Sequence, residues 1–235
     1  MSQIERLFHR FMRHLRTARG AEYRAVEDFM SECSSILDVG CGTGTFVERD
    51  SARRVGVDLN PENVDYCLSR GLDVKVGSSE KLPFADSSFD GIFCSHVFQV
   101  FSPDQAAATI KEFGRVVKPG GIVVISTLNN FRNFFQHPEN SRPYPPDALL
   151  RYFQTQHGST SPMWPGMPAM KQDGIWLRRP PLLRLRSATK PGLDRMFAGL
   201  NQIQYGLYLV KPLSFDSYVI KLRRVEAAAA VRKAH

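Results

Sequence analysis

The fold is decided by the stretch Ile36-Leu37-Asp38-Val39-Gly40-Cys41-Gly42-Thr43-Gly44-Thr45. Its first four residues are typical of a short apolar strand, and the three glycines at alternating positions predict a tight loop in front of a helix. Because glycine has no Cβ atom, the backbone of such a loop can adopt positive φ angles and lie directly against a ligand. The stretch therefore predicts a strand, a loop and a helix arranged around a small-molecule site.

The sequence on either side of this stretch alternates between strand-like and helix-like segments. We expect strands at 35–39, 54–59, 73–76, 89–95, 122–127 and 217–223, and helices at 3–18, 21–30, 45–50, 61–70, 104–117, 147–156 and 192–209. Helices that separate strands require right-handed crossovers, which produce a parallel, doubly wound α/β sheet with helices on both faces. Residues 118–121 are expected to end the helix at 104–117 before the fifth strand begins. Residues 157–190 are expected to form an irregular insertion.

Length and composition favour a single domain. The chain has 235 residues, 43% of them hydrophobic, which suits one α/β domain with a large core. We expect a helical cap over residues 1–30, a cofactor-binding core over 31–127, and a substrate-side region with the closing strand over 128–235. Apolar runs stay short of the ~20 residues that a membrane-spanning helix needs, and the N-terminus lacks a secretory pattern. A cytoplasmic protein is expected.

The four cysteines predict neither disulfides nor a metal site. They form no C-x-x-C pair, so reduced thiols are the expectation for an intracellular chain. Cys41 and Cys94 could line a pocket, although small, half-buried filler is the favoured interpretation of both.

The net charge of +8 is concentrated at the two ends of the chain. Residues 1–20 carry +4, residues 21–177 carry −5, and residues 178–235 carry +9. This asymmetry indicates an anionic partner, which can be nucleic acid, a membrane surface or a phosphorylated substrate; a solvated basic surface is the alternative. The basic amphipathic helix expected at 3–18 could lie on an anionic membrane, but packing over the core is the favoured interpretation.

The glycine loop does not fit a dinucleotide fingerprint. That fingerprint is G-x-G-x-x-G, whereas the sixth position here is Thr45 and the observed pattern is G-x-G-x-G. Asp58 follows Gly40 by eighteen residues, at the end of the second expected strand. A carboxylate at that place can accept two hydrogen bonds from a ribose diol, so the two features together predict a nucleoside site.

Four motifs in order resemble the class I S-adenosylmethionine-dependent methyltransferases. They cover about residues 35–127 and read Leu37-Asp38-Val39-Gly40-Cys41-Gly42-Thr43-Gly44, Gly56-Val57-Asp58, Gly77-Ser78-Ser79-Glu80-Lys81-Leu82-Pro83-Phe84 with Ser88-Phe89-Asp90, and Arg115-Val116-Val117-Lys118-Pro119-Gly120-Gly121. The resemblance implies a mostly parallel, seven-stranded Rossmann-like sheet. It also implies S-adenosylmethionine as cofactor and S-adenosylhomocysteine as product.

The resemblance also implies the residues that bind the cofactor. The glycine loop would meet the methionine end, Asp58 the ribose hydroxyls, and the residues after the third strand the adenine. The full set is Asp38, Gly40, Cys41, Gly42, Gly44, Asp58, Leu59, Ser78, Ser79, Glu80, Leu82 and Ser95. Leu59 and Leu82 would sandwich the ring, and because Ser78 replaces the family's usual acid, the Ser79 N–H and the Glu80 region would contact the adenine. Alternatively, Asp38 caps the loop and Glu80 is a solvated turn residue.

His96 is the candidate catalytic residue. Methyl transfer mainly requires alignment of the acceptor, and a general base is needed only where the nucleophile starts protonated, as a hydroxyl does. His96 follows the fourth expected strand, where it could take such a proton. A packed or pocket-lining histidine is the alternative.

The segment 134–149 carries the candidate substrate residues. It resembles a stretch of bacterial methyltransferases of cell-surface glycan assembly, with matches at Arg142, Pro143, Tyr144, Pro146 and Leu149. His137 and Asn140 stand where that pattern has Asp and His. The resemblance points to His137, Arg142 and Tyr144 at the substrate; Arg142 could hold a phosphate or carboxylate bidentately, or pin the loop to the sheet.

Three functions remain open on the sequence. The favoured one is a methyltransferase that acts on a small-molecule or lipid- or sugar-linked acceptor, with oxygen as the preferred atom. The alternative is a tRNA or rRNA methyltransferase that uses the basic termini, but no [DN]-P-P-[YFW] motif follows the fourth strand and no RNA-binding module is evident, so nucleic acid is not the expected partner. The third is a cofactor-binding protein without catalysis.

Overall fold

A computed structural model describes residues 18–128, 137–153, 167–178 and 217–225. The helices expected at 3–18 and 192–209 therefore lie outside the described residues, except for residue 18, and so does most of the expected cap. The division into three regions remains a prediction. Within the described ranges, no helix combines the length and apolarity needed to cross a membrane.

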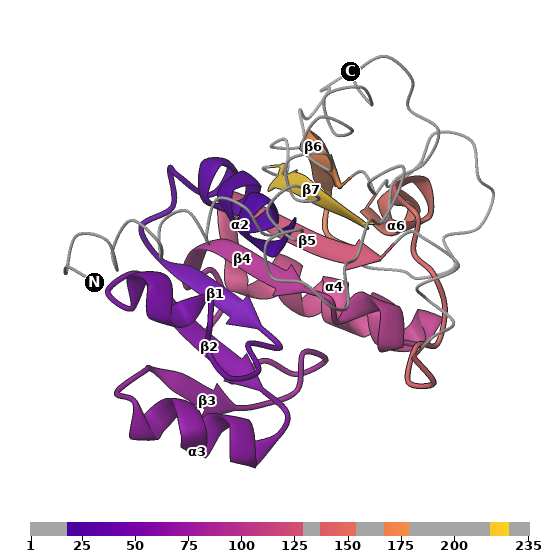
Figure 1. Ribbon diagram of the computed structural model, residues 1–235. Coiled ribbons are helices and arrows are strands. Elements are labelled where there is room, and N and C mark those ends of the chain that lie inside the picture. Colours follow the sequence, from indigo (N-terminus) through magenta and orange to yellow (C-terminus); the bar gives the residue numbers. More distant parts are fainter. Residues whose placement is uncertain (1–17, 129–136, 154–166, 179–216, 226–235) are drawn as a thin grey trace, which may run out of the picture.

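The described residues form one seven-stranded sheet with helices on both faces (Figure 1). The sheet order is β3-β2-β1-β4-β5-β7-β6. The strands are β1 (Ile36–Val39), β2 (Arg54–Asp58), β3 (Val74–Val76), β4 (Phe89–Ser95), β5 (Val117–Leu128), β6 (Met170–Arg178) and β7 (Ser217–Arg224). The pairs among β1 to β5 are parallel, and β7 runs antiparallel to both of its neighbours. The mostly parallel Rossmann-like sheet is thus confirmed.

Local sequence signals place the helices. They are α2 (Ala18–Phe29), α3 (Pro61–Ser69), α4 (Pro103–Val116) and α6 (Pro146–Phe153), with short 3₁₀ turns η1 (Val47–Asp50) and η2 (Phe98–Val100). Helix α3 begins with Asn60 as its N-cap, whose side chain accepts the Glu62 N–H at 2.9 Å. Helix α4 begins with a capping box between Ser102 and Gln105. Each cap satisfies backbone donors that a helix start leaves free.

Two expectations for the second half of the sheet were wrong. Strand β5 begins at Val117 rather than at residue 122, because Val117 pairs with Phe89 and the ladder resumes between Ile122 and Gly91 after a register shift. The Pro-Gly-Gly sequence was expected to separate the preceding helix from the strand, but it lies within β5 and bends that strand, with φ +76° at Gly120. Strand β6 lies inside the segment that was expected to be irregular.

The sheet buries two apolar layers. Alternate strand residues point to opposite faces, so Ile36, Phe93 and Val124 pack with α2 on one face. Leu37, Ile92 and Val123 are among the residues that pack with α4 and α6 on the other face. A smaller cluster joins α3 to β3. Both faces of the central strands are thus covered, which leaves the strand ends as the accessible edge.

Strand register brings the candidate residues together at one edge. Val39 pairs with Val57 on one side and with Cys94 on the other. The residues that follow each of these three positions are therefore neighbours at the carboxyl ends of parallel strands. Ser95 in turn pairs with Ser126 on β5. Ligands of doubly wound sheets bind at this edge.

Candidate active site

The three loop glycines have different surroundings. All have positive φ, at +73°, +54° and +75° for Gly40, Gly42 and Gly44. A Cβ atom on Gly40 would stand 2.5 Å from Cγ2 of Val97, and one on Gly44 would stand 2.7 Å from Cδ1 of Leu72. A Cβ on Gly42 would meet nothing within 4 Å. Gly40 and Gly44 therefore give room to the protein's own side chains, and Gly42 is the loop glycine whose backbone borders open space.

Asp58 is anchored by three protein donors. Its Oδ2 accepts the Gly42 N–H at 2.8 Å, and its Oδ1 accepts the Asn60 N–H at 2.9 Å and Nδ2 of Asn63 at 3.1 Å. A carboxylate has about four acceptor positions, and the residue is partly exposed. Asp58 is thus held in place with acceptor capacity left over, on an oxygen that lies beside the open face of Gly42.

The two leucines expected to sandwich an adenine differ in exposure. Leu59 is 73% exposed and offers an apolar surface directly after Asp58. Leu82 is 4% exposed, packs in the core, and donates its backbone N–H to Oε2 of Glu112 at 2.8 Å. In this structure Leu59 is available to a planar ring, whereas Leu82 is a core residue.

The loop that contains Ser78, Ser79 and Glu80 is tied to α4. The hydroxyls of Ser79 and Thr109 lie 2.9 Å apart, and Oε1 of Glu80 accepts Nε2 of Gln105 at 3.4 Å. The hydroxyl of Ser78 accepts the Glu80 N–H at 3.2 Å. These contacts fix the loop against α4, and the Gly77 N–H, which donates to the Asp58 carbonyl at 3.0 Å, places the start of the loop beside the end of β2. The Thr109 contact is long-range and no sequence motif marked it.

Asp38 is a buried acid in β1. It is 3% exposed, and burial is the main cause that raises its carboxyl pKa to about 7; the Arg54 charge opposes this and the Asp58 charge adds to it. Because Ile36 and Asp38 share a strand face, Asp38 lies on the α2 side of the sheet. Asp38 lies two residues before Gly40, the first glycine of the loop. This position is compatible with both interpretations of Asp38, as a cap of the loop and as a neighbour of the cofactor.

Cys41 and Cys94 fill space. Cys41 packs against the α3 cluster, and its Sγ lies 2.8 Å from where a Cβ on Gly56 would stand. Cys94 is fully buried in β4. Burial raises the pKa of both thiols, which keeps them protonated and unreactive. Ser95, at the end of β4, is partly exposed.

His96 is held by contacts with Glu22 and Ser126 that the sequence did not reveal. Its backbone N–H donates to the Ser126 carbonyl at 2.7 Å, and its Nε2 lies 3.2 Å from Oε1 of Glu22. The Ser126 hydroxyl donates to the same Glu22 oxygen at 2.5 Å. His96 also has φ +55°, a conformation that is uncommon outside glycine and is frequent at functional sites. We refer to His96, Glu22 and Ser126 as the His96 cluster.

The Glu22 carboxylate is the charged member of the His96 cluster. Burial raises its pKa, but the hydrogen bond and the charge of His96, the hydrogen bond from Ser126 and the charge of Arg178 together outweigh burial, and the net pKa is lowered. The Glu22 side chain is 4% exposed, whereas the imidazole of His96 is 26% exposed. His96 is therefore backed by a buried carboxylate and reaches the surface at the carboxyl end of β4.

The candidate substrate residues differ in exposure. His137 is exposed, with Nδ1 3.4 Å from Oε1 of Glu139, and Arg142 is exposed with its guanidinium 5.3 Å from the Tyr144 ring centroid. Tyr144 is 1% exposed and donates its hydroxyl to the Phe101 carbonyl at 3.0 Å. Tyr144 is thus a core residue here, which leaves His137 and Arg142 for contact with a ligand.

Gln99 connects this segment to the His96 edge. Its carbonyl accepts the backbone N–H groups of Ser141 and Arg142, at 2.8 and 3.4 Å. Its side-chain Oε1 accepts the Thr127 hydroxyl at 3.3 Å. The segment that begins at residue 137 therefore lies along η2, three residues beyond His96 in the chain.

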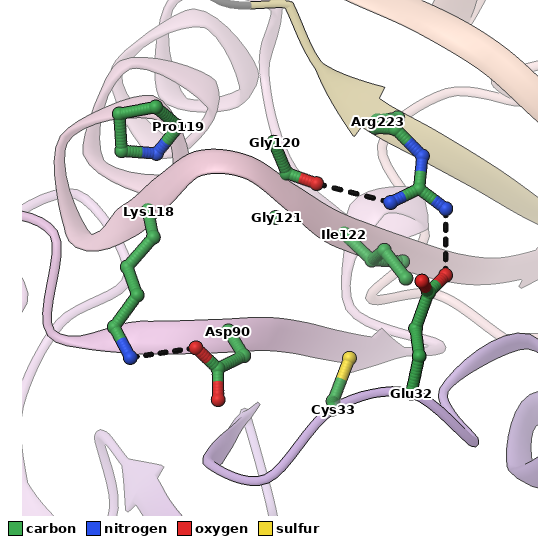
Figure 2. A pocket seen from close by; sticks show the side chains of 9 residues that line it. All are labelled: Glu32, Cys33, Asp90, Lys118, Pro119, Gly120, Gly121, Ile122 and Arg223. Atoms are coloured by element: carbon green, nitrogen blue, oxygen red, sulfur yellow. Dashed lines mark hydrogen bonds and ion pairs between the residues drawn. The ribbon is translucent and has the colours of Figure 1, made fainter.

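A surface hollow of about 250 Å³ lies at the opposite edge of the sheet (Figure 2). Its charged side chains are paired with one another: Lys118 contacts Asp90 at 2.6 Å, and Arg223 contacts Glu32 at 2.6 Å. These residues stand near the amino ends of β4 and β5, away from the glycine loop. The hollow is therefore separate from the candidate active site.

Comparisons with known proteins agree with the fold. Residues 37–125 match the family described as "Methyltransferase domain". Over 94 residues the chain is 39% identical to a "Probable tRNA methyltransferase 9B" of Bos taurus, which covers 39% of this chain and 21% of that protein. Over 102 residues it is 36% identical to a "Malonyl-[acyl-carrier protein] O-methyltransferase" of Hahella chejuensis, which covers 40% of this chain and 36% of that protein.

A solved structure shows the same fold over most of the chain. A SAM-dependent methyltransferase from Archaeoglobus fulgidus superposes with a TM-score of 0.60 at 20% identity, over 87% of this chain and 92% of that chain. The chain spans only about a fifth to a half of the length of the curated relatives it matches. Because tRNA methyltransferases are among these relatives, the expectation that nucleic acid is not a partner lacks support.

The site fits the cofactor that the family uses. Open space beside Gly42, a fixed carboxylate with spare acceptor capacity at Asp58, and the exposed face of Leu59 suit a nucleoside bound along the carboxyl edge. The matched segment and the four motifs occupy the same part of the chain, which also forms β1 to β5. Residues 37–125 form a class I methyltransferase domain whose cofactor is S-adenosylmethionine.

Proposed function

We propose that the whole protein transfers a methyl group to a hydroxyl oxygen of an anionic small-molecule or lipid- or sugar-linked acceptor. The observation that carries this proposal is His96, backed by the Glu22 carboxylate, at the edge where the cofactor site lies. A neutral amine or a carboxylate can attack through a free lone pair, whereas a hydroxyl has to lose its proton to a base. A histidine held by a carboxylate is the common protein arrangement for that task.

The residues of this chain would share the work as follows. S-adenosylmethionine supplies a methyl group already activated by its sulfonium sulfur. Asp58 would hold the ribose hydroxyls, and the backbone of Gly42 would border the cofactor. As the acceptor oxygen bonds to the methyl carbon and the carbon–sulfur bond breaks, the hydroxyl proton would pass to Nδ1 of His96. Alignment of the reacting atoms would provide most of the rate gain, on the order of 7–11 kcal/mol.

The anionic character of the acceptor is supported by charge. The segment 178–235 carries twelve basic and three acidic residues, and Arg142 is exposed beside the segment that follows His96. Arginine binds phosphate and carboxylate through two parallel hydrogen bonds. These features support a phosphorylated or carboxylated acceptor. The likeness of residues 134–149 to glycan methyltransferases supports a sugar-linked one.

A tRNA or rRNA methyltransferase is the second candidate. It is favoured by the relatives named as tRNA methyltransferases and by the same basic segments. The two candidates differ in their dependence on salt, because a protein that neutralises several phosphates loses RNA affinity steeply as salt rises.

The deciding experiment is methyl transfer into a native extract with isotopically labelled cofactor. The purified protein is incubated with extract, and the RNA, lipid and soluble fractions are analysed by mass spectrometry. Label in lipid or soluble metabolites supports the first proposal, and label in RNA supports the second. The Asp58→Ala variant serves as the control that should not transfer label.

Formation of S-adenosylhomocysteine separates both candidates from a protein that binds the cofactor without using it. If calorimetry detects cofactor binding and no extract fraction leads to S-adenosylhomocysteine, the proposed activity is wrong. The third possibility, binding without catalysis, would then stand.

A further inference from the structure

We propose that Glu22 is the positioning residue of His96: it holds the Nε2–H group and so leaves Nδ1 as the nitrogen that accepts a proton. This inference rests on the proposed function, because it takes His96 to be the general base. Glu22 lies in α2, 74 positions before His96, and no motif connects the two.

The contacts fix the imidazole from two sides. The backbone of His96 is tied to the Ser126 carbonyl at 2.7 Å, so this residue cannot move away from β5 without breaking the end of the strand pair. Oε1 of Glu22 meets Nε2 of His96 at 3.2 Å and the Ser126 hydroxyl at 2.5 Å. Three elements, α2, the end of β4, and β5, therefore converge on one carboxylate oxygen.

The charge state of Glu22 determines which nitrogen carries the hydrogen. An ionised carboxylate only accepts hydrogen bonds, and the contacts from His96 and Ser126 favour the ionised form despite burial. Nε2 must then be the donor. In a neutral imidazole the other nitrogen has the lone pair, and Nδ1 of His96 has no hydrogen-bond partner among the described residues.

Among the described residues, the groups that act on this cluster come from three elements. Helix α2 contributes Glu22, strand β5 contributes Ser126, and Arg178 at the end of β6 acts on Glu22 through its charge. The arrangement places one buried negative charge against Nε2 and the partly exposed part of the imidazole at the site. This arrangement corresponds to a general base that is oriented by a carboxylate.

A purely structural role for Glu22 makes a different prediction. In that case Glu22 would pin α2 to the sheet through Ser126, and its loss would lower stability without affecting His96. A spectroscopic signature of the imidazole therefore separates the two roles. The Nε2–H proton should exchange slowly with water in the wild type, because Nε2 lies 3.2 Å from an oxygen of a buried carboxylate.

The test is nitrogen-15 NMR of the full-length protein with labelled histidine, in which His96→Gln identifies the His96 signals. Exchange of the Nε2–H proton should accelerate at least tenfold in Glu22→Met and Glu22→Ala. It should stay slow in Glu22→Gln, whose amide oxygen still accepts the bond. Asp28→Ala, which removes an exposed acid from the same helix, should leave the signal unchanged.

Turnover measured with the acceptor fraction completes the test. We expect kcat to fall at least tenfold in Glu22→Met, with cofactor affinity unchanged, and to recover largely in Glu22→Gln. An unchanged His96 signal in both Glu22→Met and Glu22→Ala overturns the inference, even where the wild type is active. A wild type that shows the slow proton but transfers no methyl group to any fraction instead contradicts the proposed function.

Discussion

The carboxylate of Asp58 accepts the backbone N–H of Gly42 at 2.8 Å, so the end of β2 holds the loop that follows β1. The same carboxylate accepts the Asn60 N–H and the Asn63 amide at the start of α3. Asp58 therefore has a structural task in the chain as well as the expected task of binding ribose. Experiments on this residue have to separate the two.

Asp58→Ala should weaken S-adenosylmethionine binding at least tenfold in isothermal titration calorimetry, because it removes a charged acceptor. Asn63→Ala removes one donor to Oδ1 and leaves the carboxylate in place, so it should change affinity by less than about threefold, on the order of 0.6 kcal/mol.

The ribose contact itself can be measured with S-adenosylhomocysteine and its 2′-deoxy analogue. The wild type should prefer the ribose form, and Asp58→Ala should bind the two forms about equally. If the wild type does not distinguish them, or if Asp58→Ala keeps full affinity, Asp58 does not bind the ribose.

Gly42→Ala should weaken cofactor binding at least tenfold while the protein still folds. A Cβ at Gly42 meets no protein atom within 4 Å, but it would occupy the space assigned to the ligand. Gly71 is a matched control, since it also has positive φ and open surroundings but lies at the end of α3. Each alanine should cost about 1–2 kcal/mol for the left-handed backbone.

The comparison of these two variants decides where the ligand lies. Thermal unfolding should show similar losses in Tm for Gly42→Ala and Gly71→Ala, and calorimetry should show at least a tenfold loss of affinity for Gly42→Ala alone. Equal affinities would place the ligand away from the open face of the glycine loop.

The sequence predicted those elements whose signals are local. Strand β4 was expected at its observed bounds because a buried apolar run follows a polar turn. The start of α3 was marked by its Asn60 cap and Pro61. Strand β6 was missed because it is an edge strand with exposed polar residues, Lys171, Gln172 and Asp173 among them, and so lacks an apolar run.

The residues of the candidate site also divide into those that local sequence signals predicted and those that they did not. The glycine loop and Asp58 lie within one βαβ unit, so their spacing in the sequence determines their spacing in space. Glu22 contacts His96 and Ser126, which are 74 and 104 positions away, and only the folded chain brings them together. Tyr144 resembled a ligand residue because it is aromatic and polar, but its hydroxyl is satisfied by the Phe101 carbonyl in the core.

Asp38→Asn should change how stability depends on pH. The folded-state pKa of Asp38 is raised to about 7, mainly by burial, from an ordinary 3.8. The folded protein therefore holds this proton more tightly than the unfolded chain, and the stability that it contributes at low pH is lost as pH rises through that window. Removing the carboxyl should reduce that loss by on the order of 4 kcal/mol at most.

Urea denaturation at pH 5 and pH 8 measures this effect. The gain from Asp38→Asn relative to wild type should be larger at pH 8. Asp173→Asn is the control, because hydrogen bonds from Lys221 and Arg223 lower the pKa of Asp173 below its ordinary 3.8. Its contribution is lost only as pH falls below that value, so the difference between wild type and Asp173→Asn should be the same at pH 5 and pH 8. The same difference between wild type and Asp38→Asn at both pH values would show that Asp38 does not titrate in this range.

Arg115→Leu should loosen the loop of residues 78–86. Arg115 donates to the carbonyls of Leu82 and Phe84, at 3.0 and 2.8 Å, and pairs with Glu112, whose Oε2 also accepts the Leu82 N–H. Hydrogen bonds to charged groups contribute about 1.5–3 kcal/mol each, so this one side chain fixes the loop that is expected to contact adenine.

Hydrogen–deuterium exchange should accelerate in residues 79–84 and leave β4 protected, while cofactor affinity falls several-fold. Lys111→Ala, an exposed change on the same helix, should alter neither quantity. Faster exchange without any loss of affinity would mean that this loop does not contribute to cofactor binding.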